Sequence, residues 1–348
     1  MRLKKLSDQV IVITGATSGI GLTTARMAAA QGAKLVLAAR AEDALHQLEK
    51  ELQSFGTEAL VVPTDVGDKS DVAALAKAAI ARFGRIDTWV NNAGISIYGR
   101  LQEVSDEDNH RLFQTNFWGV VNGSMEAVKH LKEQGGALIN LGSELSDVSV
   151  PLQGMYAASK HAVKGFTDSL RMELEKDGLP IAVTLIKPAG IDTMFAQHAK
   201  NYMDVEPSLP APIYAPELVA EAILYAAQHQ KRDVAVGAAS KVSAVGGFHF
   251  PRLFDKLGET LLWNQQRSDQ PKRANRKDAL YSPDTSKELR QRQGMNGVHE
   301  TSPYTQASLR YKPLSIALLG GGALMAAWML SKSASRTGDG ADADAPRN

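Results

Sequence analysis

The fold is decided by the stretch Val10-Ile11-Val12-Ile13-Thr14-Gly15-Ala16-Thr17-Ser18-Gly19-Ile20-Gly21. Its first four residues form a short apolar, β-branched run, which is typical of a strand buried in a parallel sheet. The residues from Leu22 to Ala30 continue with a helical pattern that Gly32 closes. The order of strand, glycine-containing turn and helix predicts the opening of a βαβ unit.

The turn predicts a site for a dinucleotide. Gly15, Gly19 and Gly21 let the backbone turn tightly and approach a pyrophosphate. The helix that follows offers unpaired N–H groups and the positive end of its dipole to that anion. The spacing is G-x-x-x-G-x-G rather than the more common G-x-G-x-x-G. The alternative is a tight strand–helix turn that binds no ligand.

The end of the second predicted strand bears on the choice of cofactor. Residues 34–39 predict this strand, and Arg40 follows it directly. An acidic residue here would accept a hydrogen bond from the ribose 2′-hydroxyl of NAD, whereas a cation suits the 2′-phosphate of NADP. Arg40 therefore predicts a preference for NADP(H) over NAD(H). The alternative is a solvated loop arginine.

Tyr156 and Lys160 predict an acid and the cation that tunes it. They are four residues apart in a helical pattern that runs from Met155 to Leu174, so both lie on one helix face. A phenol has an ordinary pKa near 10, and a neighbouring ammonium lowers that pKa because it favours the phenolate. The pair is expected to recur by chance, so it carries weight only together with other site residues.

Further polar and small residues follow strands of the same predicted sheet. Ser143 lies just beyond the apolar run 137–141, while Asn91-Asn92-Ala93-Gly94 and Pro188–Thr193 follow two other short strands. In open α/β sheets ligands bind outside the carboxyl ends of the strands. Helical patterns alternate with these strands, so we expect an α/β fold with a doubly wound parallel sheet, the Rossmann fold. They cover Glu42–Phe55, Ser70–Phe83, Asp106–Lys132, Met155–Lys176 and Pro216–Gln228.

Taken together, these motifs resemble the short-chain dehydrogenase/reductase family, of the type with a single Rossmann domain, over roughly residues 7–250. The resemblance implies a hydride-transferring enzyme in which Tyr156 is the general acid or base. Lys160 would hold the nicotinamide ribose, Ser143 would orient the substrate, and Asn116 would hold a water of a proton relay. The resemblance also implies the following cofactor contacts: Gly15, Thr17, Ser18, Gly19, Ile20, Gly21, Arg40, Asp65, Val66, Asn92, Ala93, Gly94, Tyr156, Lys160, Pro188, Ile191 and Thr193.

The chain departs from the family pattern at one position and offers a choice at another. The family usually has glycine directly after the proline of the last motif, but here Ala189 intervenes before Gly190. Ser146 and Ser149 lie near Ser143, which has the better position and spacing to Tyr156. In this family the helix that carries Asn116 and the helix after it often build subunit interfaces, so the resemblance also implies a homo-oligomer.

Composition excludes several other classes of function. The 348 residues carry a net charge of +1, which gives no global support to nucleic-acid binding. The absence of cysteine excludes disulfides, thiol nucleophiles and cysteine-based metal sites. The eight histidines show no ligand spacing, so we expect no metal.

The substrate side and the C-terminal part are less regular. Residues 194–216 contain apolar side chains and three prolines, and the family's equivalent stretch is a mobile lid, which suggests a lipophilic substrate; the alternative is that they only pack on the body. Residues 249–263 predict an amphipathic helix that docks as core or lies on a membrane surface. Residues 264–312 are polar and predict a flexible linker.

The segment Leu314–Leu330 is uncharged and flanked by basic residues, which predicts a single membrane anchor. The expected organisation is a Rossmann domain at 1–250, helix and linker at 251–313, a transmembrane helix at 314–331 and a disordered tail at 332–348. The catalytic domain would face the cytoplasm; the alternative is a soluble cytoplasmic protein. The predicted function is NADP(H)-dependent oxidation or reduction of a lipophilic alcohol, ketone or aldehyde. The alternatives are a non-catalytic NADP(H)-binding scaffold and an epimerase or dehydratase.

Overall fold

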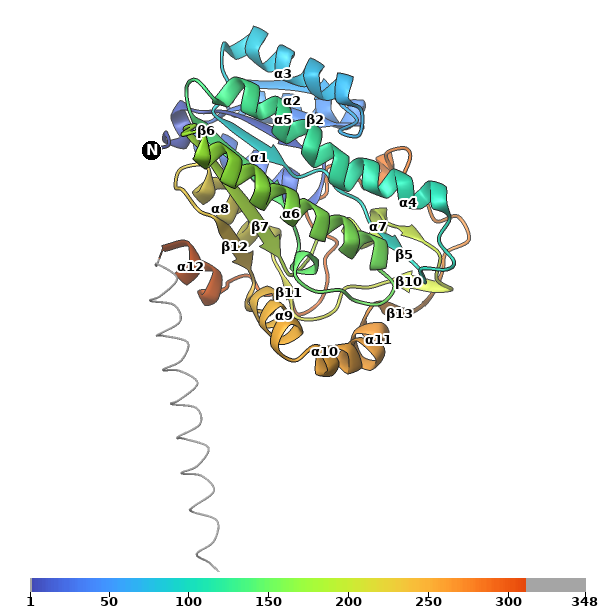
Figure 1. The fold of residues 1–348 in the computed structure, drawn as a ribbon. Helices are drawn as coiled ribbons and strands as arrows, with labels where there is room; N and C mark the ends of the chain where they lie inside the picture. Colours follow the sequence, from blue (N-terminus) through green and yellow to red (C-terminus); the bar gives the residue numbers. More distant parts are fainter. Residues whose placement is uncertain (1, 311–348) are drawn as a thin grey trace, which may run out of the picture. The chain divides into compact units, whose positions relative to one another are not determined.

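A parallel sheet forms the centre of the structure. The computed structural model describes residues 2–310. Within them seven strands form one parallel sheet in the order β12-β7-β6-β4-β1-β2-β3, which confirms the predicted α/β Rossmann architecture (Figure 1). The strands are β1 (Val10–Thr14), β2 (Lys34–Ala39), β3 (Ala59–Pro63), β4 (Thr88–Asn91), β6 (Gly136–Leu141), β7 (Ile181–Pro188) and β12 (Asp233–Val236).

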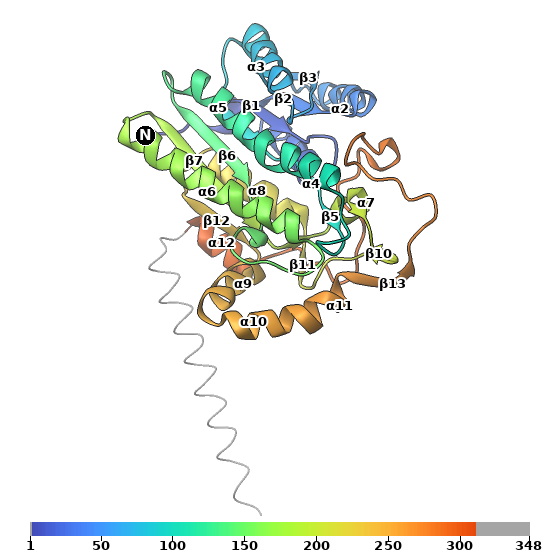
Figure 2. The ribbon, with the colours of Figure 1, turned by 45° about the vertical axis from the view of Figure 1, so that its right-hand side comes forward.

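Helices cover both faces of this sheet. Figures 1 and 2 show α3 (Lys69–Phe83), α5 (Gly119–Leu131) and α6 (Gly154–Lys176) side by side on one face. Their apolar side chains, such as Leu75 and Leu131, pack with Val12 and Val36 of the sheet in one buried cluster. The remaining crossover helices are α1 (Gly19–Ala29), α2 (Glu42–Ser54) and α8 (Pro216–Ala226).

The strand order places a switch point beside the glycine turn. β1 pairs with β2 on one side and with β4 on the other, so the chain reverses its winding between β1 and β4. The carboxyl ends of these two strands, at Thr14 and Asn91, therefore diverge into loops that leave in opposite directions. Ligands of doubly wound sheets bind in the crevice at such a point.

The long helix expected at 106–132 is interrupted. It consists of α4 (Asp106–Phe113), a π-helical turn at Gln114–Trp118 and α5. Ser105 caps α4 by accepting a hydrogen bond from the backbone N–H of Asp108, at 3.2 Å, as its sequence position predicts. The π-helical turn contains Asn116, and such turns occur frequently at functional sites.

Three small strand pairs fasten the predicted lid to the body. They are β5 (Ile97–Tyr98) with β9 (Lys200–Asn201), β8 (Gly190–Ile191) with β11 (Ile213–Tyr214), and β10 (Val205–Pro207) with β13 (Arg267–Pro271). The lid also contains the short helix α7 (Phe195–His198). The third pair joins the lid to a segment more than fifty residues later in the chain.

The predicted amphipathic helix is divided and exposes its apolar face. The structure has α9 (Ala238–His249), α10 (Pro251–Leu257), a π-helical turn at Gly258–Leu262 and α11 (Trp263–Gln265). Phe254 packs partly against the body. The expectation that this helix docks as core is therefore met only in part, because the following side chains are 43–63% exposed: Phe250, Leu253, Leu257 and Leu261.

The polar segment after residue 266 is ordered against the body, which differs from the flexible linker that its composition predicts. The first compact unit of the chain extends through Thr305, whereas the Rossmann domain was predicted to end at residue 250. Polar contacts hold the segment: Arg276 pairs with Glu206 at 3.1 Å, and both side chains are almost fully buried. The segment contains the 3-10 turn Thr285–Lys287 and leads to α12 (Pro303–Arg310), where the description ends.

The helices within residues 2–310 are all too short or too polar to cross a lipid bilayer. The predicted transmembrane helix at 314–331 and the tail at 332–348 lie outside the described residues.

The glycine turn has no room for a side chain at Gly21. A Cβ atom there would lie 2.1 Å from the carbonyl oxygen of Gly15, which is backbone and cannot rotate away. We therefore expect Gly21→Ala to lower the free energy of unfolding by about 1–3 kcal/mol, the usual cost of overpacking, measured by denaturant titration.

Gly165→Ala in α6 is the matched control. A Cβ atom at Gly165 meets no other atom within 4 Å, so alanine there should leave stability unchanged or raise it by up to about 1 kcal/mol. Equal stability of the two variants would contradict the importance of this close packing.

Candidate active site

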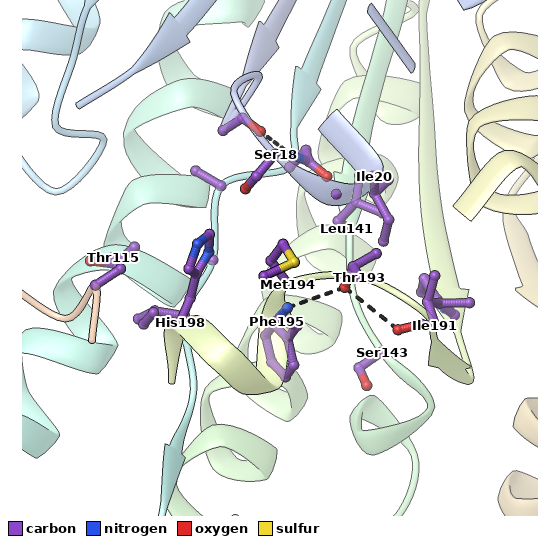
Figure 3. A pocket seen from close by; sticks show the side chains of 18 of the residues that line it. Ser18, Ile20, Thr115, Leu141, Ser143, Ile191, Thr193, Met194, Phe195 and His198 are labelled. Carbon is purple, nitrogen blue, oxygen red and sulfur yellow. Dashed lines mark hydrogen bonds between the residues drawn. The ribbon is translucent and has the colours of Figure 1, made fainter. Parts of the chain in front are cut away.

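One cavity gathers nearly all the predicted site residues at the carboxyl ends of β1, β4, β6 and β7 (Figure 3). Gly21 and Asn116 are the two predicted residues that do not line it. The predicted residues in its wall are Gly15, Thr17, Ser18, Gly19, Ile20, Arg40, Asp65, Val66, Asn92, Ala93, Gly94, Ser143, Tyr156, Lys160, Pro188, Ile191 and Thr193.

The glycine turn is shaped to bring backbone close to a ligand. Gly15 and Gly19 have φ angles of +67° and +50°, which favour glycine. A Cβ atom at Gly19 would lie 3.1 Å from Cβ of Thr193, which also lines the cavity. The side-chain amide of Asn92 donates to the carbonyl oxygens of Thr14 (2.8 Å) and Gly15 (3.1 Å), so it braces the turn. These glycines and the N-terminus of α1 fit a pyrophosphate.

Arg40 lies in the cavity wall, and its half-buried guanidinium contacts the C-terminal segment. It donates hydrogen bonds to the carbonyl oxygens of Leu280 (3.2 Å), Tyr281 (3.1 Å) and Ala279. Burial lowers the pKa of Arg40, and the carboxylate of Asp65 opposes that shift. The solvated-loop alternative for Arg40 is therefore wrong.

Asp65 is held in a defined position beside the same end of the cavity. Its carboxylate accepts hydrogen bonds from Arg111 (2.5 Å) and from the backbone N–H of Gly67 (3.0 Å). The backbone N–H of Asp65 in turn donates to Asp71 at 3.0 Å.

Tyr156, Ser143 and Lys160 converge at the opposite end of the cavity. The Ser143 side chain lies close enough to the Tyr156 hydroxyl to lower its pKa. Nζ of Lys160 lies 5.8 Å from the centroid of the Tyr156 ring and donates to the carbonyl oxygen of Leu141 at 2.8 Å. Of the three candidate serines only Ser143 lines the cavity, since Oγ of Ser146 accepts a hydrogen bond from the backbone N–H of Ser143.

The expected lowering of the tyrosine pKa is not found. Burial raises the pKa of Tyr156 above its ordinary value, the hydrogen bond with Ser143 opposes this shift, and the carboxylate of Glu144 adds to it. Burial also lowers the pKa of Lys160 to about 8. Desolvation disfavours the charged form of both groups and outweighs the attraction between them.

Asn116 lies behind the cavity wall. Its side-chain amide accepts from the backbone N–H of Ile95 (2.9 Å) and donates to the carbonyl oxygen of Ile95 (2.8 Å) and to Ser159 (3.2 Å). A Cβ atom placed at Gly94 would lie 3.5 Å from Oδ1 of Asn116 and 3.8 Å from Nζ of Lys160. Asn116 is thus near Lys160, but it shapes the loop after β4 rather than facing the cavity.

Ala189, where the family usually has glycine, fits the structure without strain. Its backbone N–H donates to the carbonyl oxygen of Val236 in β12, at 3.0 Å. Gly190 follows at a tighter place, where a Cβ atom would lie 3.1 Å from the carbonyl oxygen of Pro210. The glycine that the family usually has directly after the proline is therefore found one position later, at Gly190.

Six polar residues of the cavity wall were not predicted, namely Thr64, Thr115, Glu144, Gln153, His198 and Glu288. Burial raises the pKa of Glu144 to about 7. Burial and the cation of Lys287 lower the pKa of His198 to about 4, so its ring is neutral at pH 7. In Figure 3 His198 and Thr115 lie on the side of the view away from Ile191 and Ser143.

Three of these unpredicted residues carry a buried polar atom without a hydrogen-bond partner among residues 2–310: Oγ1 of Thr115, Nε2 of His198 and Oε2 of Glu288. Buried polar atoms are normally paired, so unpaired ones in a cavity wall point to contacts with a ligand. For these three residues the sequence offers one signal, which is that Thr115 lies next to Asn116. No sequence signal indicates that His198 or Glu288 lines the cavity.

Apolar side chains surround Tyr156. The Phe195 ring packs edge-on against the Tyr156 ring at a centroid distance of 5.3 Å. The other apolar side chains at this end come from the loop after β6 and from the lid: Leu145, Val150, Met194, Leu209 and Pro210.

Comparison with known proteins agrees with this geometry. The short chain dehydrogenase family matches residues 9–203. This chain belongs to that family. It is also 47% identical over 336 residues to the uncharacterized oxidoreductase YxnA of Bacillus subtilis, covering 95% of this chain and 93% of that one. The chain is therefore a short-chain dehydrogenase/reductase, an oxidoreductase.

Other members of the family show the same fold or sequence pattern. The putative oxidoreductase SadH of Mycobacterium tuberculosis is 36% identical over 57% of this chain and 72% of its own. A Burkholderia phymatum member in complex with NAD superposes with a TM-score of 0.63 at 27% identity, covering 78% of this chain and 100% of that chain. An alcohol dehydrogenase from Thermococcus sibiricus, complexed with 5-hydroxy-NADP, gives 0.58 at 28% identity over 65% and 95%.

Proposed function

We propose that this oxidoreductase reduces lipophilic ketones or aldehydes, or oxidises the corresponding alcohols, with NADP(H) as the preferred cofactor. The observation that carries the proposal is a single cavity that joins the glycine turn at one end to Tyr156, Ser143 and Lys160 at the other. A scaffold that only binds a dinucleotide has no need for a buried phenol paired with a hydroxyl and an ammonium.

Tyr156 supplies the proton. Because burial raises its pKa, the phenol is protonated at neutral pH and can donate to the oxygen of a substrate carbonyl. Ser143 adds a second hydroxyl beside that oxygen and fixes its direction. The bound nicotinamide supplies the hydride in reduction and accepts it in oxidation. Lys160 holds the nicotinamide ribose, and its ammonium compensates negative charge that develops on Tyr156.

The rest of the cavity wall accommodates the cofactor. In this proposal the turn from Gly15 to Ile20 binds the pyrophosphate, Asp65 and Val66 contact the adenine, and Ile191 and Thr193 meet the carboxamide. Arg40 is the source of the NADP(H) preference, since it places a guanidinium at the end of β2 where a 2′-phosphate would lie. The support is that all these residues share one cavity wall.

The substrate is a small molecule with an apolar body. Phe195 and Leu145 pack with Tyr156, Met194 also lines the cavity, and Glu144 is an acidic group that acts on the Tyr156 pKa. With a pKa near 7, Glu144 is partly neutral at physiological pH and would disfavour an anionic substrate at higher pH.

We also propose, on the family resemblance, that the protein forms a homo-oligomer.

Tyr156→Phe removes the proton donor and keeps the ring. We expect kcat/KM for carbonyl reduction with NADPH to fall by about 10²–10⁴-fold, the usual contribution of a positioned acid, in an assay of a panel of ketones and aldehydes. Tyr225→Phe, outside the cavity, is the control and should leave the rate unchanged. Wild-type protein that binds NADPH but oxidises none of it with any carbonyl would contradict the proposal and favour a scaffold or an epimerase.

The reduction rate should depend on the charge of Lys160. Its pKa of about 8 means that the ammonium is present below pH 8 and is lost as the pH rises further, so kcat/KM should decline above about pH 8. Lys160→Arg keeps its charge and should remove this decline, even if its rate is lower throughout. Glu144→Gln removes a second titrating group of the cavity wall. As a control, this variant should retain the decline of kcat/KM above about pH 8. A wild-type profile that is flat from about pH 6 to 10 would refute this role.

We further propose that residues 314–330 anchor the protein in a membrane with its catalytic domain in the cytoplasm, on the strength of their uncharged sequence and basic flanks. The full chain should then sediment with membranes and resist extraction at high salt. A chain that ends at Arg310 should remain in the supernatant. Full-length protein that stays in the supernatant would disprove the anchor.

A further inference from the structure

The segment formed by residues 279–294, here called the strap, roofs the end of the cavity at Arg40. It is fixed to two elements of the body that lie beside it in Figure 2. The hydroxyl of Tyr281 donates to Asp108 of α4 at 2.8 Å, and Nε of Arg111 donates to the carbonyl oxygen of Leu280 at 3.1 Å. Nζ of Lys287 donates to the carbonyl oxygen of Gln197 in α7, at 3.0 Å.

The strap also bonds directly to the glycine turn. The backbone N–H of Leu289 donates to the carbonyl oxygen of Thr17 at 2.7 Å, and that of Gly19 donates to the carbonyl oxygen of Arg290 at 3.0 Å. These two bonds hold the residue before Leu289 against the turn. That residue is Glu288, and it lines the cavity.

The carboxylate of Glu288 lies in the cavity wall within electrostatic range of Arg40. Burial raises the pKa of Glu288, while the Thr17 side chain and the cation of Arg40 oppose that shift. Its Oε2 atom is buried and has no hydrogen-bond partner in the described part of the chain. A carboxylate oxygen accepts hydrogen bonds only, so a ligand group that pairs with it must be a donor.

The same strap limits what Arg40 can offer. Both Nη atoms of Arg40 donate to strap carbonyl oxygens, those of residues 279–281. This end of the cavity therefore holds the guanidinium of Arg40, some of whose N–H groups already bond to the strap, together with the carboxylates of Glu288 and Asp65. This set can bind a hydroxyl, and it binds a dianionic phosphate less strongly than Arg40 alone would.

We infer that Glu288 is a second determinant of cofactor choice, which accepts a hydrogen bond from the adenosine ribose 2′-hydroxyl and repels a 2′-phosphate. It thereby offsets the preference that Arg40 creates and keeps NAD(H) usable. The inference rests on the proposed function only in that the cavity binds a nicotinamide dinucleotide. The acidic residue that is missing after β2 is supplied from a position almost 250 residues later in the chain.

The test is the ratio of two dissociation constants, measured by titrating the full-length protein with NADPH and with NADH and following fluorescence. Glu288→Gln removes the charge and keeps the shape. We expect the affinity for NADPH relative to NADH to rise about tenfold, because a charge repulsion near 1.4 kcal/mol is removed. Glu288→Ala should move the ratio in the same direction, and Arg40→Ala should move it in the opposite direction.

Glu300→Gln is the matched control. Glu300 follows the strap and pairs with Arg292 at 2.6 Å, with its own side chain 59% exposed, and it should leave the ratio unchanged. Thermal midpoints confirm that each variant is folded. If both Glu288 variants still bind both cofactors but their affinity for NADPH relative to NADH is unchanged or falls, the inference is overturned and the proposed function stands. Wild-type protein that binds neither cofactor overturns the proposed function and the inference with it.

Discussion

The close contact between the glycine turn after β1 and the loop after β4 is the constraint on which the site depends. Asn92 donates to the carbonyl oxygens of Thr14 and Gly15, and Gly21 approaches Gly15 so closely that a methyl group would collide with backbone. This contact packs the glycine turn against the loop after β4 at the switch point of the sheet. It leaves the N-terminus of α1 facing the cavity, where the positive end of the helix dipole favours an anion. The first N–H of this helix, that of Gly19, is paired with the strap carbonyl oxygen of Arg290.

The site is then completed by one crossover helix and by two segments outside the central sheet. α6 brings Tyr156 and Lys160 to one end of the cavity, and Phe195 from the lid packs on the Tyr156 ring. The strap roofs the other end and is held by polar bonds rather than by an apolar core. Burial of both side chains explains why the pKa values of Tyr156 and Lys160 shift toward their neutral forms.

The Rossmann sheet, its crossover helices and most of the cavity wall could be predicted, because short apolar runs and the residues directly after them are local patterns. The strap could not, since its polar composition is that of a linker and its bonds to Arg40 and Thr17 join residues some 240–270 positions apart. Glu288 was missed for the same reason, whereas His198 was missed because its place in the predicted lid did not show that it is buried in the cavity wall. The direction of the Tyr156 pKa shift was wrong because the spacing to Lys160 shows proximity but not burial.

The central claim is that one cavity holds the dinucleotide from the strap to Tyr156. The most direct measurement is a crystal structure of the protein grown with NADP⁺. The account predicts the adenosine phosphate beside Arg40 and Glu288, the pyrophosphate on the turn at Gly19, and the nicotinamide next to Tyr156 and Lys160. A dinucleotide bound elsewhere, or a strap that fills the cavity and excludes the cofactor, would contradict it.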